Sequence, residues 1–402
     1  MGFYINNSKY SKLNVWVNNF VQIVKFYLFE WKFKMPLIVI LSAISALACK
    51  ELKEPVPVNE ADKEEAKEIA PVDRGDVFTN IFDDIILKQY EVFNDKAKSF
   101  LEDVDEFKEE PTLSSLESLQ EQWKEYKLVW EGIEIYDIGY IADNFLHNRI
   151  DKYPTNVKFI EKNLSEGKTL DNNFVDNSGS TTVGLPVLEY LLFKGESQNE
   201  ILAHFTSDTN NHHYLDYVSS LSGNLAEKSE EILTELKKER NTWILNEGEN
   251  TLNELINSQI SILEEIRGTK LDKPLGSANG GNPDPEIVES PYANASFDAI
   301  RFNLYSLKLN MEADTSKSNL YDLLNYIQRD EDNKLVNKIQ DALEASLVTL
   351  GAFSNPLKVE VVNNTTGVEK LSEEIGVLLV AIKVDLANLL GVTVVFNDND
   401  GD

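Results

Sequence analysis

The sequence predicts an all-α protein of two up-and-down helical bundles packed together, with a short extended tail at its C-terminus. Three observations lead to this fold class. Apolar residues recur at three- and four-residue steps through most of the chain after residue 76, runs of β-branched residues are few, and 402 residues suffice for two bundles. Long helices with short connections pack as bundles. We expect the first bundle over residues 76–245 and the second over residues 246–402.

The first bundle is predicted to begin with two long helices. The apolar stripe of the first helix consists of Ile81, Phe82, Ile85, Ile86, Tyr90, Phe93, Ala97, Phe100, Leu101 and Val104. Pro111 and Thr112 begin the second helix, whose buried side carries Leu116, Leu119, Trp123, Tyr126, Trp130 and Ile133. A turn-rich segment follows and leads into the stretch TTVGLPVLEYLLF at residues 181–193. Another long helix is expected from about Asn211 to Arg240.

The second bundle is predicted to start with a helix over residues 251–266. Residues 267–291 contain clustered Gly and Pro, which we expect to interrupt the helical pattern. Helical periods then return at 296–311, 319–328, 335–350 and 367–390. The closing residues GVTVVFNDNDGD form the expected extended tail.

The overall charge of the protein restricts its partners. The formal net charge is −30 at pH 7, although 42% of the residues are hydrophobic and 26% are charged, as is usual for a packed protein. A chain this acidic is repelled by nucleic-acid phosphates and by anionic membrane surfaces. We therefore exclude nucleic-acid binding and expect the surface to attract cations or basic partners.

The N-terminal region contains a candidate export signal. Pro36–Ala48 is a run of thirteen uncharged residues, too short to span a bilayer as a helix and suited to the apolar core of a secretion signal. The run ends at Cys49, the only cysteine, and with Ala46 and Ala48 it resembles a bacterial lipobox. We predict a signal peptide over residues 1–48, lipidation of Cys49, and an outer-membrane lipoprotein that is periplasmic or surface-exposed. Whether translation starts at residue 1 or at Met35 stays open.

Residues 49–75 are predicted to be the lipid anchor and a flexible tether. This segment has few large apolar residues and contains Pro55, Pro57 and Pro71, so it cannot bury enough surface to order itself. Its acidic residues close behind Cys49 resemble the export signals of surface-displayed lipoproteins.

One charged residue, Glu189, stands out within TTVGLPVLEYLLF. A helix starting near Val183 would have Pro186 in its first turn, where the missing N–H of proline costs nothing. Glu189 would then lie about one turn inside a helix that is apolar on all sides and therefore buried. An isolated buried carboxylate costs several kcal/mol or stays protonated. Glu189 therefore needs a cation, a set of hydrogen-bond donors, or a metal.

Several segments resemble the imelysin-like family of bacterial periplasmic and lipid-anchored proteins tied to iron and haem acquisition. GLPVLEYLLF is similar to the GxHxxE segment of that family. WEGIEIYDIGYI, RIDKYPTNVKFIE, the second-half segment from RGTKLDKPLG to FDAIRFNL, and LGVTVVFNDNDGD also resemble family segments, in the same order. The resemblance covers roughly residues 80–402 and implies two helical bundles.

The sequence departs from the family motif at the position of its histidine. In GxHxxE the His and Glu share one helix face and can bind one metal ion. Here Pro186 replaces the histidine and has no ligand atom, although Gly184 and Glu189 remain. Any metal ion bound by Glu189 would need its other ligands elsewhere. The peptidase activity attached to the family is in doubt, and we favour a protein that is not an enzyme.

Two interpretations of Glu189 remain open. Arg301 lies in the mostly apolar segment FDAIRFNLYSL, so a buried Arg301–Glu189 pair is the structural interpretation. The functional interpretation is a ligand pocket between the bundles, since small ligands usually bind in such clefts. The expected lining is Gly184, Glu189, Trp130, Tyr292, Ser296 and Arg301.

Three functions are compatible with these observations. The first is a non-catalytic lipoprotein that binds iron, haem or another ligand in this cleft as part of uptake, with the membrane and iron or haem uptake proteins as partners. The second is a metallopeptidase, as the family resemblance implies. The third is a surface interaction or adhesion module whose acidic surface meets a basic partner.

Overall fold

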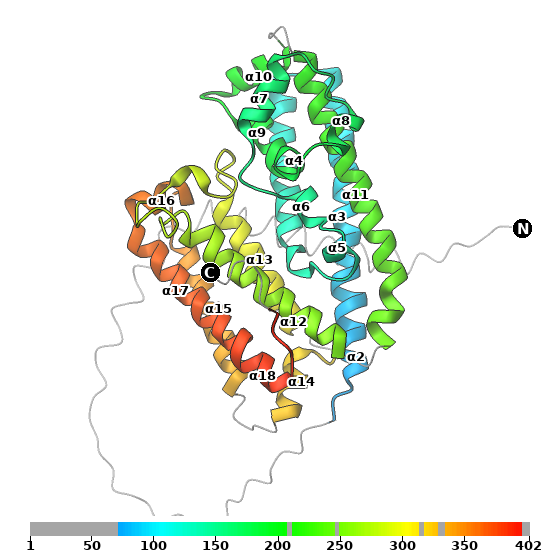
Figure 1. Ribbon diagram of the computed structural model, residues 1–402, viewed down its shortest axis with the longest axis vertical. Coiled ribbons are helices and arrows are strands. Elements are labelled where there is room, and N and C mark those ends of the chain that lie inside the picture. Colours follow the sequence, from blue (N-terminus) through cyan, green and yellow to red (C-terminus); the bar gives the residue numbers. More distant parts are fainter. Residues whose placement is uncertain (1–70, 207–210, 246–248, 313–316, 329–333, 396–402) are drawn as a thin grey trace, which may run out of the picture. The chain divides into compact units, whose positions relative to one another are not determined.

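The computed structural model describes residues 71–206, 211–245, 249–312, 317–328 and 334–395. Every regular element in these ranges is helical, which confirms the predicted all-α fold class (Figure 1). The predicted signal peptide, Cys49 and most of the predicted tether lie outside the described residues. In the described part of the chain, no helix is both long and apolar enough to cross a membrane.

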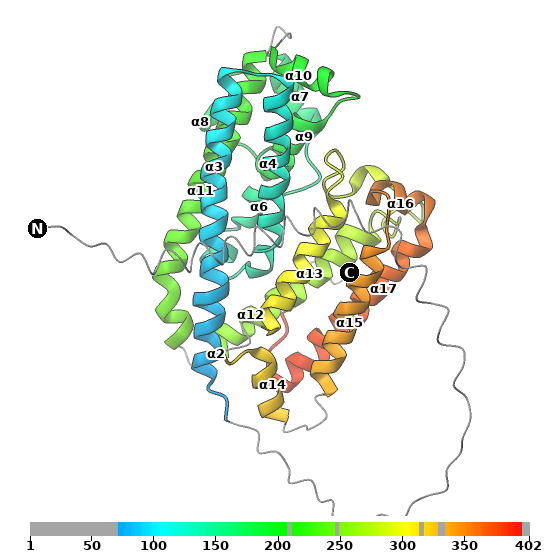
Figure 2. The same ribbon diagram turned by 180° about the vertical axis from the view of Figure 1, so that it is seen from behind.

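Three long helical segments form the first group. The first segment runs through α2 (Arg74–Asn80), the π-helix η2 (Ile81–Ile86) and α3 (Leu87–Glu109) without a break. It packs along α4 (Leu113–Glu131) and α11 (Asn211–Leu245), as Figure 2 shows. The Thr112 side chain starts α4 by accepting a hydrogen bond from the Ser115 backbone N–H, which is a capping box. The predicted stripes are the buried faces, except that Leu101 is only partly buried and that Ile133, although buried, lies beyond the end of α4.

The segment between α4 and α11 contains more helix than the sequence suggested. Its elements are η3 (Glu134–Tyr136), α5 (Tyr140–Asp143), α6 (His147–Ile150), α7 (Val157–Ser165), α8 (Asn172–Asp176), η4 (Ser180–Thr182), α9 (Leu185–Phe193) and α10 (Gln198–Thr206). Asn156 and Asp171 cap α7 and α8 by accepting hydrogen bonds from the Phe159 and Phe174 N–H groups. These helices are too short for a clear apolar period, so only α9 was apparent from the sequence.

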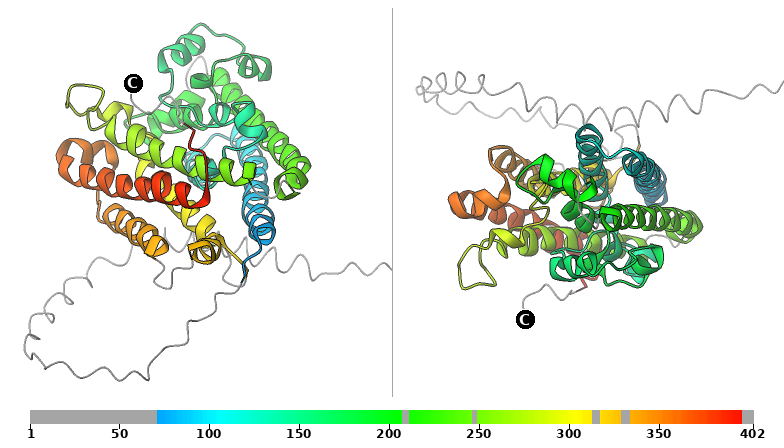
Figure 3. Two further views of the ribbon diagram at one scale, coloured as in Figure 1. Left: turned by 60° about the horizontal axis from the view of Figure 1, so that its bottom comes forward. Right: turned by 90° about the horizontal axis from the view of Figure 1, so that it is seen from above.

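The second group begins with α12 (Glu249–Glu264). The elements after it are η5 (Glu265–Asp272), η6 (Pro285–Ile287), α13 (Ser296–Glu312), α14 (Leu320–Gln328), α15 (Lys334–Gly351), α16 (Leu357–Asn363), α17 (Thr365–Val380), η7 (Ala381–Leu386) and α18 (Ala387–Leu390). Figure 3 shows α15 and α17 running together, with α12 packed beside α17. Beyond α18, Thr393 and Val395 donate backbone hydrogen bonds to the Asn253 and Asn257 side chains.

The predicted helix break at residue 267 is wrong. The helix continues as the π-helix η5 to Asp272, and Lys273 N–H still donates to Gly268 O at its end. Clustered Gly and Pro lie nearby, but Ile266, Lys270 and Leu271 are all buried here, and this packing outweighs the weak local preference of Gly268. A π-helix changes which side chains face inward, and π-helical segments often occur at functional sites.

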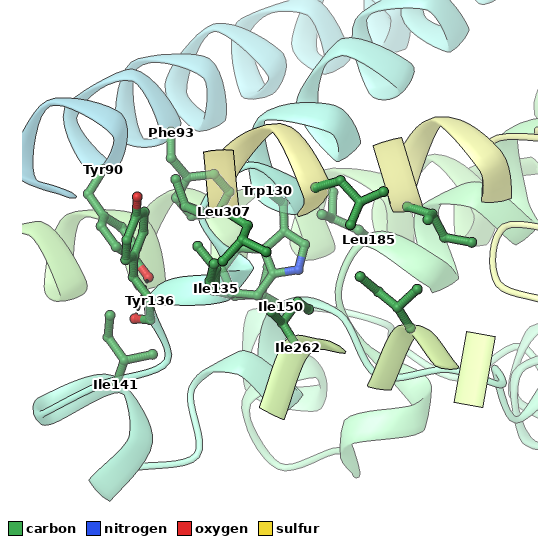
Figure 4. Close-up of a cluster of buried hydrophobic side chains, with 14 of the residues drawn as sticks. Tyr90, Phe93, Trp130, Ile135, Tyr136, Ile141, Ile150, Leu185, Ile262 and Leu307 are labelled. Carbon is green, nitrogen blue, oxygen red and sulfur yellow. Dashed lines mark hydrogen bonds between the residues drawn. The ribbon is translucent and has the colours of Figure 1, made fainter. Parts of the chain in front are cut away.

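A shared hydrophobic core joins the first and second groups of helices. Figure 4 shows side chains that converge on it from both groups, among them Tyr90, Phe93, Trp130, Ile135, Tyr136, Ile262 and Leu307. The Phe93 and Trp130 ring centroids lie 5.4 Å apart. All described residues belong to one compact unit. The division into bundles at residue 245 therefore stays a prediction.

Candidate functional site

The start of α9 requires glycine at position 184. Gly184 has φ +82°, and a Cβ placed there would lie 2.3 Å from Ile150 O and 2.8 Å from Arg149 O. Pro186 lies in the first turn of α9, as predicted. Gly184 therefore does not present a ligand atom; it lets the backbone of α9 pass directly against residues 149–150.

Two side chains of α4 hold α9 in place. Trp123 Nε1–H donates to Leu185 O at 3.1 Å, and Gln120 Nε2–H donates to Leu192 O at 2.6 Å. Residues 185–192 are all buried, which confirms the prediction of a helix without an exposed face. Since both ends of α9 are anchored to α4, the position of Glu189 is fixed by the fold.

Glu189 is 2% exposed and is bound by backbone donors rather than by arginine. Its Oε1 accepts hydrogen bonds from the N–H groups of Tyr292 at 2.9 Å and Ala293 at 2.7 Å. The Arg301–Glu189 pair, one of the two open interpretations, is not formed: Glu189 binds these two N–H groups, and Arg301 pairs with Asp298 one turn earlier on α13. Burial raises the pKa of Glu189 to about 7, even though the two N–H donors lower it.

A buried lysine lies between three acids next to Glu189. Lys127 Nζ is 2.5 Å from Glu131 Oε1 and 2.8 Å from Glu289 Oε1, and it also binds Asp151 Oδ2. All four side chains are at most 2% exposed. Ion pairs this deeply buried are stable only when their geometry is good and their remaining polar atoms are bound.

A second buried lysine binds the other oxygens of Glu131 and Glu289 and adds a fourth acid, Glu134. Lys270 Nζ, on η5, is 2.9 Å from Glu131 Oε2, 3.1 Å from Glu134 Oε2 and 3.1 Å from Glu289 Oε2. Asn303 accepts from Lys270 at 3.0 Å and donates to Glu131 Oε2 at 3.0 Å. We call this set the charge network; it consists of Lys127, Glu131, Glu134, Asp151, Lys270 and Glu289.

The charge network has two ammonium groups for four carboxyl groups. Burial acts to lower the pKa of Lys127 and Lys270, but the acids outweigh it and raise both pKa values well above the usual range. Burial raises the pKa of Glu289 to about 7 and that of Glu134 well above its usual value. The two lysines outweigh burial only for Glu131, whose pKa is lowered. Burial therefore opposes the ionisation of Glu134 and Glu289, and the two lysines offset it only in part.

Two cavities adjoin the charge network. The larger has a volume of about 470 Å³ and is lined by Glu134, Asp137, His147, Asn148, Asp151, Lys152, Tyr153, Pro154, Ser258, Ser261, Ile262, Glu265, Thr269, Lys273 and Ile287. The smaller, of about 100 Å³, includes Pro186, Glu189, Glu289 and Tyr292 in its lining. Asp151, Tyr153 and Pro154 line both cavities. The segment 151–154 is thus the wall that they share.

The predicted pocket residues are only partly brought together. Glu189 and Tyr292 both line the smaller cavity, and Ser296 lies close by because its hydroxyl donates to Glu289 O. Gly184, Trp130 and Arg301 line neither of the two cavities. Their roles in the structure are, respectively, a close backbone approach, a core contact and an ion pair on α13.

The charge network was missed in the sequence. Lys127 and Glu131 fall on the buried stripe of α4, next to Tyr126 and Trp130, and four residues apart. Two charged residues at this spacing on an apolar face are the signal that could have revealed a buried pair. Lys270 and Glu289 had no such signal, since they lie in a segment that the sequence assigned to a loop.

A metal site of the kind implied by GxHxxE does not fit the residues on α9. Pro186 has no ligand atom, and Glu189 Oε1 already accepts two backbone hydrogen bonds. In the described ranges, the side chains that could hold a metal ion as a group are Glu131, Asp151 and Glu289. The nitrogen of Lys127 lies among these three acids.

We predict that Glu189→Gln stabilises the protein at alkaline pH. An acid whose folded pKa is about 7, against the model-compound value of 4.5, binds a proton more tightly when folded. Folding stability therefore falls as pH rises between these two values, and the cost is fully present above the folded pKa. The stability gain of the variant should grow from about pH 4.5 to about pH 7 and reach up to about 3 kcal/mol. Urea unfolding at several pH values measures it, and a pH-independent loss of stability would contradict it.

Comparisons with known proteins identify what the chain resembles. The family model described as Imelysin matches residues 86–378. An imelysin-like protein from Psychrobacter arcticum is 18% identical, with a TM-score of 0.68 over 82% of this chain and 99% of that chain. A structure named as an iron-regulated protein A precursor, from Parabacteroides distasonis, is also 18% identical, with a TM-score of 0.65 over 78% of this chain and 95% of that chain. No protein with a curated description matches.

Proposed function

This chain belongs to the imelysin family, and we propose that it is a lipid-anchored, non-catalytic member that binds a positively charged iron species in its larger cavity as part of uptake. Support for iron comes from the similar structure that is named as iron-regulated. Support for a positively charged ligand comes from the residues that line the cavity.

The observation that carries the proposal is a buried oxygen of Asp151 that has no hydrogen-bond partner among the described residues. Its side chain is 1% exposed, it lines both cavities, and only one of its oxygens is bound, by Lys127. The other oxygen, Oδ1, is buried and accepts no hydrogen bond from the described residues. A buried carboxylate oxygen without a donor is costly unless something else binds it. A cation in the cavity would supply that partner.

The other residues that line the larger cavity also suit a cation. Four acids line the larger cavity, against two lysines and one histidine. His147 Nδ1 lies 3.1 Å from Asp137 Oδ2, and Tyr153 adds a phenol oxygen that donates to Glu265 at 3.1 Å. Carboxylates and imidazole are ligands that iron accepts. Asp137, His147 and Asp151 would offer such atoms from separate points of the lining, since these three described residues do not form a group whose ligand atoms all lie within 4.8 Å of one another.

The absence of catalysis is proposed on the chemistry of α9. Metallopeptidases need a firmly held ion with an open position for water. Pro186 supplies no ligand where the family motif has histidine, and Glu189 is engaged by the Tyr292 and Ala293 N–H groups. In the proposed uptake role, the protein binds iron and catalyses no reaction with it.

Two substitutions in the cavity test iron binding. Asp137→Asn and His147→Ala change side chains that are about one-third exposed, so folding should be preserved. Each is expected to weaken iron binding about tenfold or more, measured by calorimetric titration and elemental analysis. Asp216→Asn is the matched control, because Asp216 is exposed and pairs with Lys108 away from the cavity lining. Undiminished binding in both variants, or no iron binding by the unmodified protein, would contradict the proposal. Absorption spectra recorded with haem show whether the protein binds iron in that form.

The lipid anchor is tested at Cys49. We expect the full chain, expressed in a bacterium that processes lipoproteins, to incorporate labelled fatty acid and to sediment with membranes. Cys49→Ser should abolish the label and release the protein into the soluble fraction. Equal membrane association of both proteins would argue against the anchor.

A further inference from the structure

Three buried acids form a group with the geometry of a metal site. Glu131 comes from α4, Asp151 follows α6, and Glu289 precedes α13, and ligand oxygens of all three lie within 4.8 Å of one another. Hard divalent cations such as Ca²⁺ and Mn²⁺ prefer carboxylate oxygens in this kind of arrangement. We call Glu131, Asp151 and Glu289 the acid triad.

The centre of the acid triad is filled by the protein itself. Lys127 Nζ contacts one oxygen of each acid: Glu131 Oε1 at 2.5 Å, Glu289 Oε1 at 2.8 Å, and Asp151 Oδ2. A lysine ammonium has three N–H donors, one for each of these oxygens. Metal–oxygen distances of about 2.0–2.6 Å are only slightly shorter than these contacts. An ammonium nitrogen and a divalent ion therefore suit nearly the same position.

We propose that Lys127 is an internal cation that occupies the place of a metal ion in the acid triad, and that removing its side chain opens a site for a divalent, oxygen-coordinated ion. Helix α4 delivers this cation, since Lys127 lies four residues before Glu131 on the same face. Lys270 cannot replace it, because Lys270 binds Glu131, Glu134 and Glu289 but makes no contact with Asp151. The acid triad shares Asp151 with the larger cavity, but Lys127 binds its Oδ2, whereas the oxygen proposed to face the iron species is Oδ1.

A second feature of the chain agrees with this assignment. Pro186, one turn from Glu189, has no ligand atom; Glu189 is held by backbone N–H groups, and Glu131 and Glu289 are held by lysines. The charges that neutralise the acid triad are thus side chains of the protein itself.

Lys127→Ala tests the proposal through its response to metal. Thermal unfolding is recorded for the unmodified protein, for Lys127→Ala and for the exposed control Lys124→Ala, each with EDTA, Ca²⁺ or Mn²⁺. The unmodified protein and the control should respond alike to each condition, so any effect of an ion in the larger cavity is common to both. Lys127→Ala should melt lower in EDTA and regain about 4 °C or more with an ion at about 100 times its dissociation constant. Elemental analysis should find one additional ion, and Lys127→Ala/Glu289→Gln should lose most of this gain.

Each other outcome counts against the proposal. If EDTA destabilises the unmodified protein and Glu289→Gln removes that effect, a metal ion already belongs to the triad. If Lys127→Ala folds but gains neither an ion nor stability, the triad is no metal site. Should the alanine variant not fold in any condition, Lys127→Gln takes the same titration, because its amide oxygen can join the ligand set; no response there would also overturn the assignment.

Discussion

Replacing Lys270 by methionine should destabilise the protein by about 3–5 kcal/mol, because the substitution leaves buried carboxylates without their ammonium partner. Lys270 is 1% exposed and lies within 3.1 Å of oxygens of Glu131, Glu134 and Glu289. Methionine fills a similar volume, so the loss should reflect charge and not a cavity. Denaturant unfolding at pH 7 measures the effect.

Two variants separate this explanation from a general effect of removing lysine. Lys124→Met removes an exposed lysine from α4 and should change stability by less than about 0.5 kcal/mol. Adding Glu131→Gln to Lys270→Met should recover part of the loss, since one buried negative charge is removed together with the positive one. Equal stability of Lys270→Met and the unmodified protein would show that the network is not an electrostatic unit.

Gly184→Ala is the second substitution with a large expected effect, about 3 kcal/mol or more. The positive φ of +82° is strained for alanine, and its Cβ would lie 2.3 Å from Ile150 O, a backbone atom that cannot move alone. Relief would require residues 149–151 to shift, and Asp151 belongs to the charge network. The variant should therefore also weaken ligand binding in the larger cavity.

Gly179→Ala is the matched control for this prediction. Gly179 has φ −67°, and a Cβ at this position meets nothing within 4 Å. The control should be neutral or slightly stabilising, because alanine loses less conformational entropy on folding. If Gly184→Ala unfolds at the same denaturant concentration as Gly179→Ala, the close approach between α9 and residue 150 is not as tight as described.

The long helices could be predicted because each has a continuous apolar stripe. The stripe from Ile81 to Val104 lies inside η2 and α3, and the period at 335–350 corresponds to α15. Residues 267–272 could not be predicted as helix from local preference. Their helical state depends on burying Ile266 and Leu271 and on pairing Lys270 with acids distant in the sequence.

At the candidate site, the sequence predicts that Glu189 needs a partner, but it does not identify that partner. Burial of Glu189 followed from its apolar neighbours. Its donors, the N–H groups of Tyr292 and Ala293, belong to a loop more than a hundred residues away. Backbone N–H groups occur at nearly every residue, so sequence composition cannot identify which of them point at a carboxylate. The roles proposed for Cys49 and for the cavity remain predictions.

Iron-edge anomalous diffraction from crystals soaked in an iron salt would test the central claim most directly. That claim is that the larger, acidic cavity binds the positively charged ligand, while Lys127 and Lys270 occupy the adjoining charge network. We expect an anomalous peak in the larger cavity beside Asp151 and His147, and none between Glu131, Asp151 and Glu289. A peak at the Lys127 nitrogen position, on α9 beside Glu189, or at neither place despite occupied surface sites would contradict it.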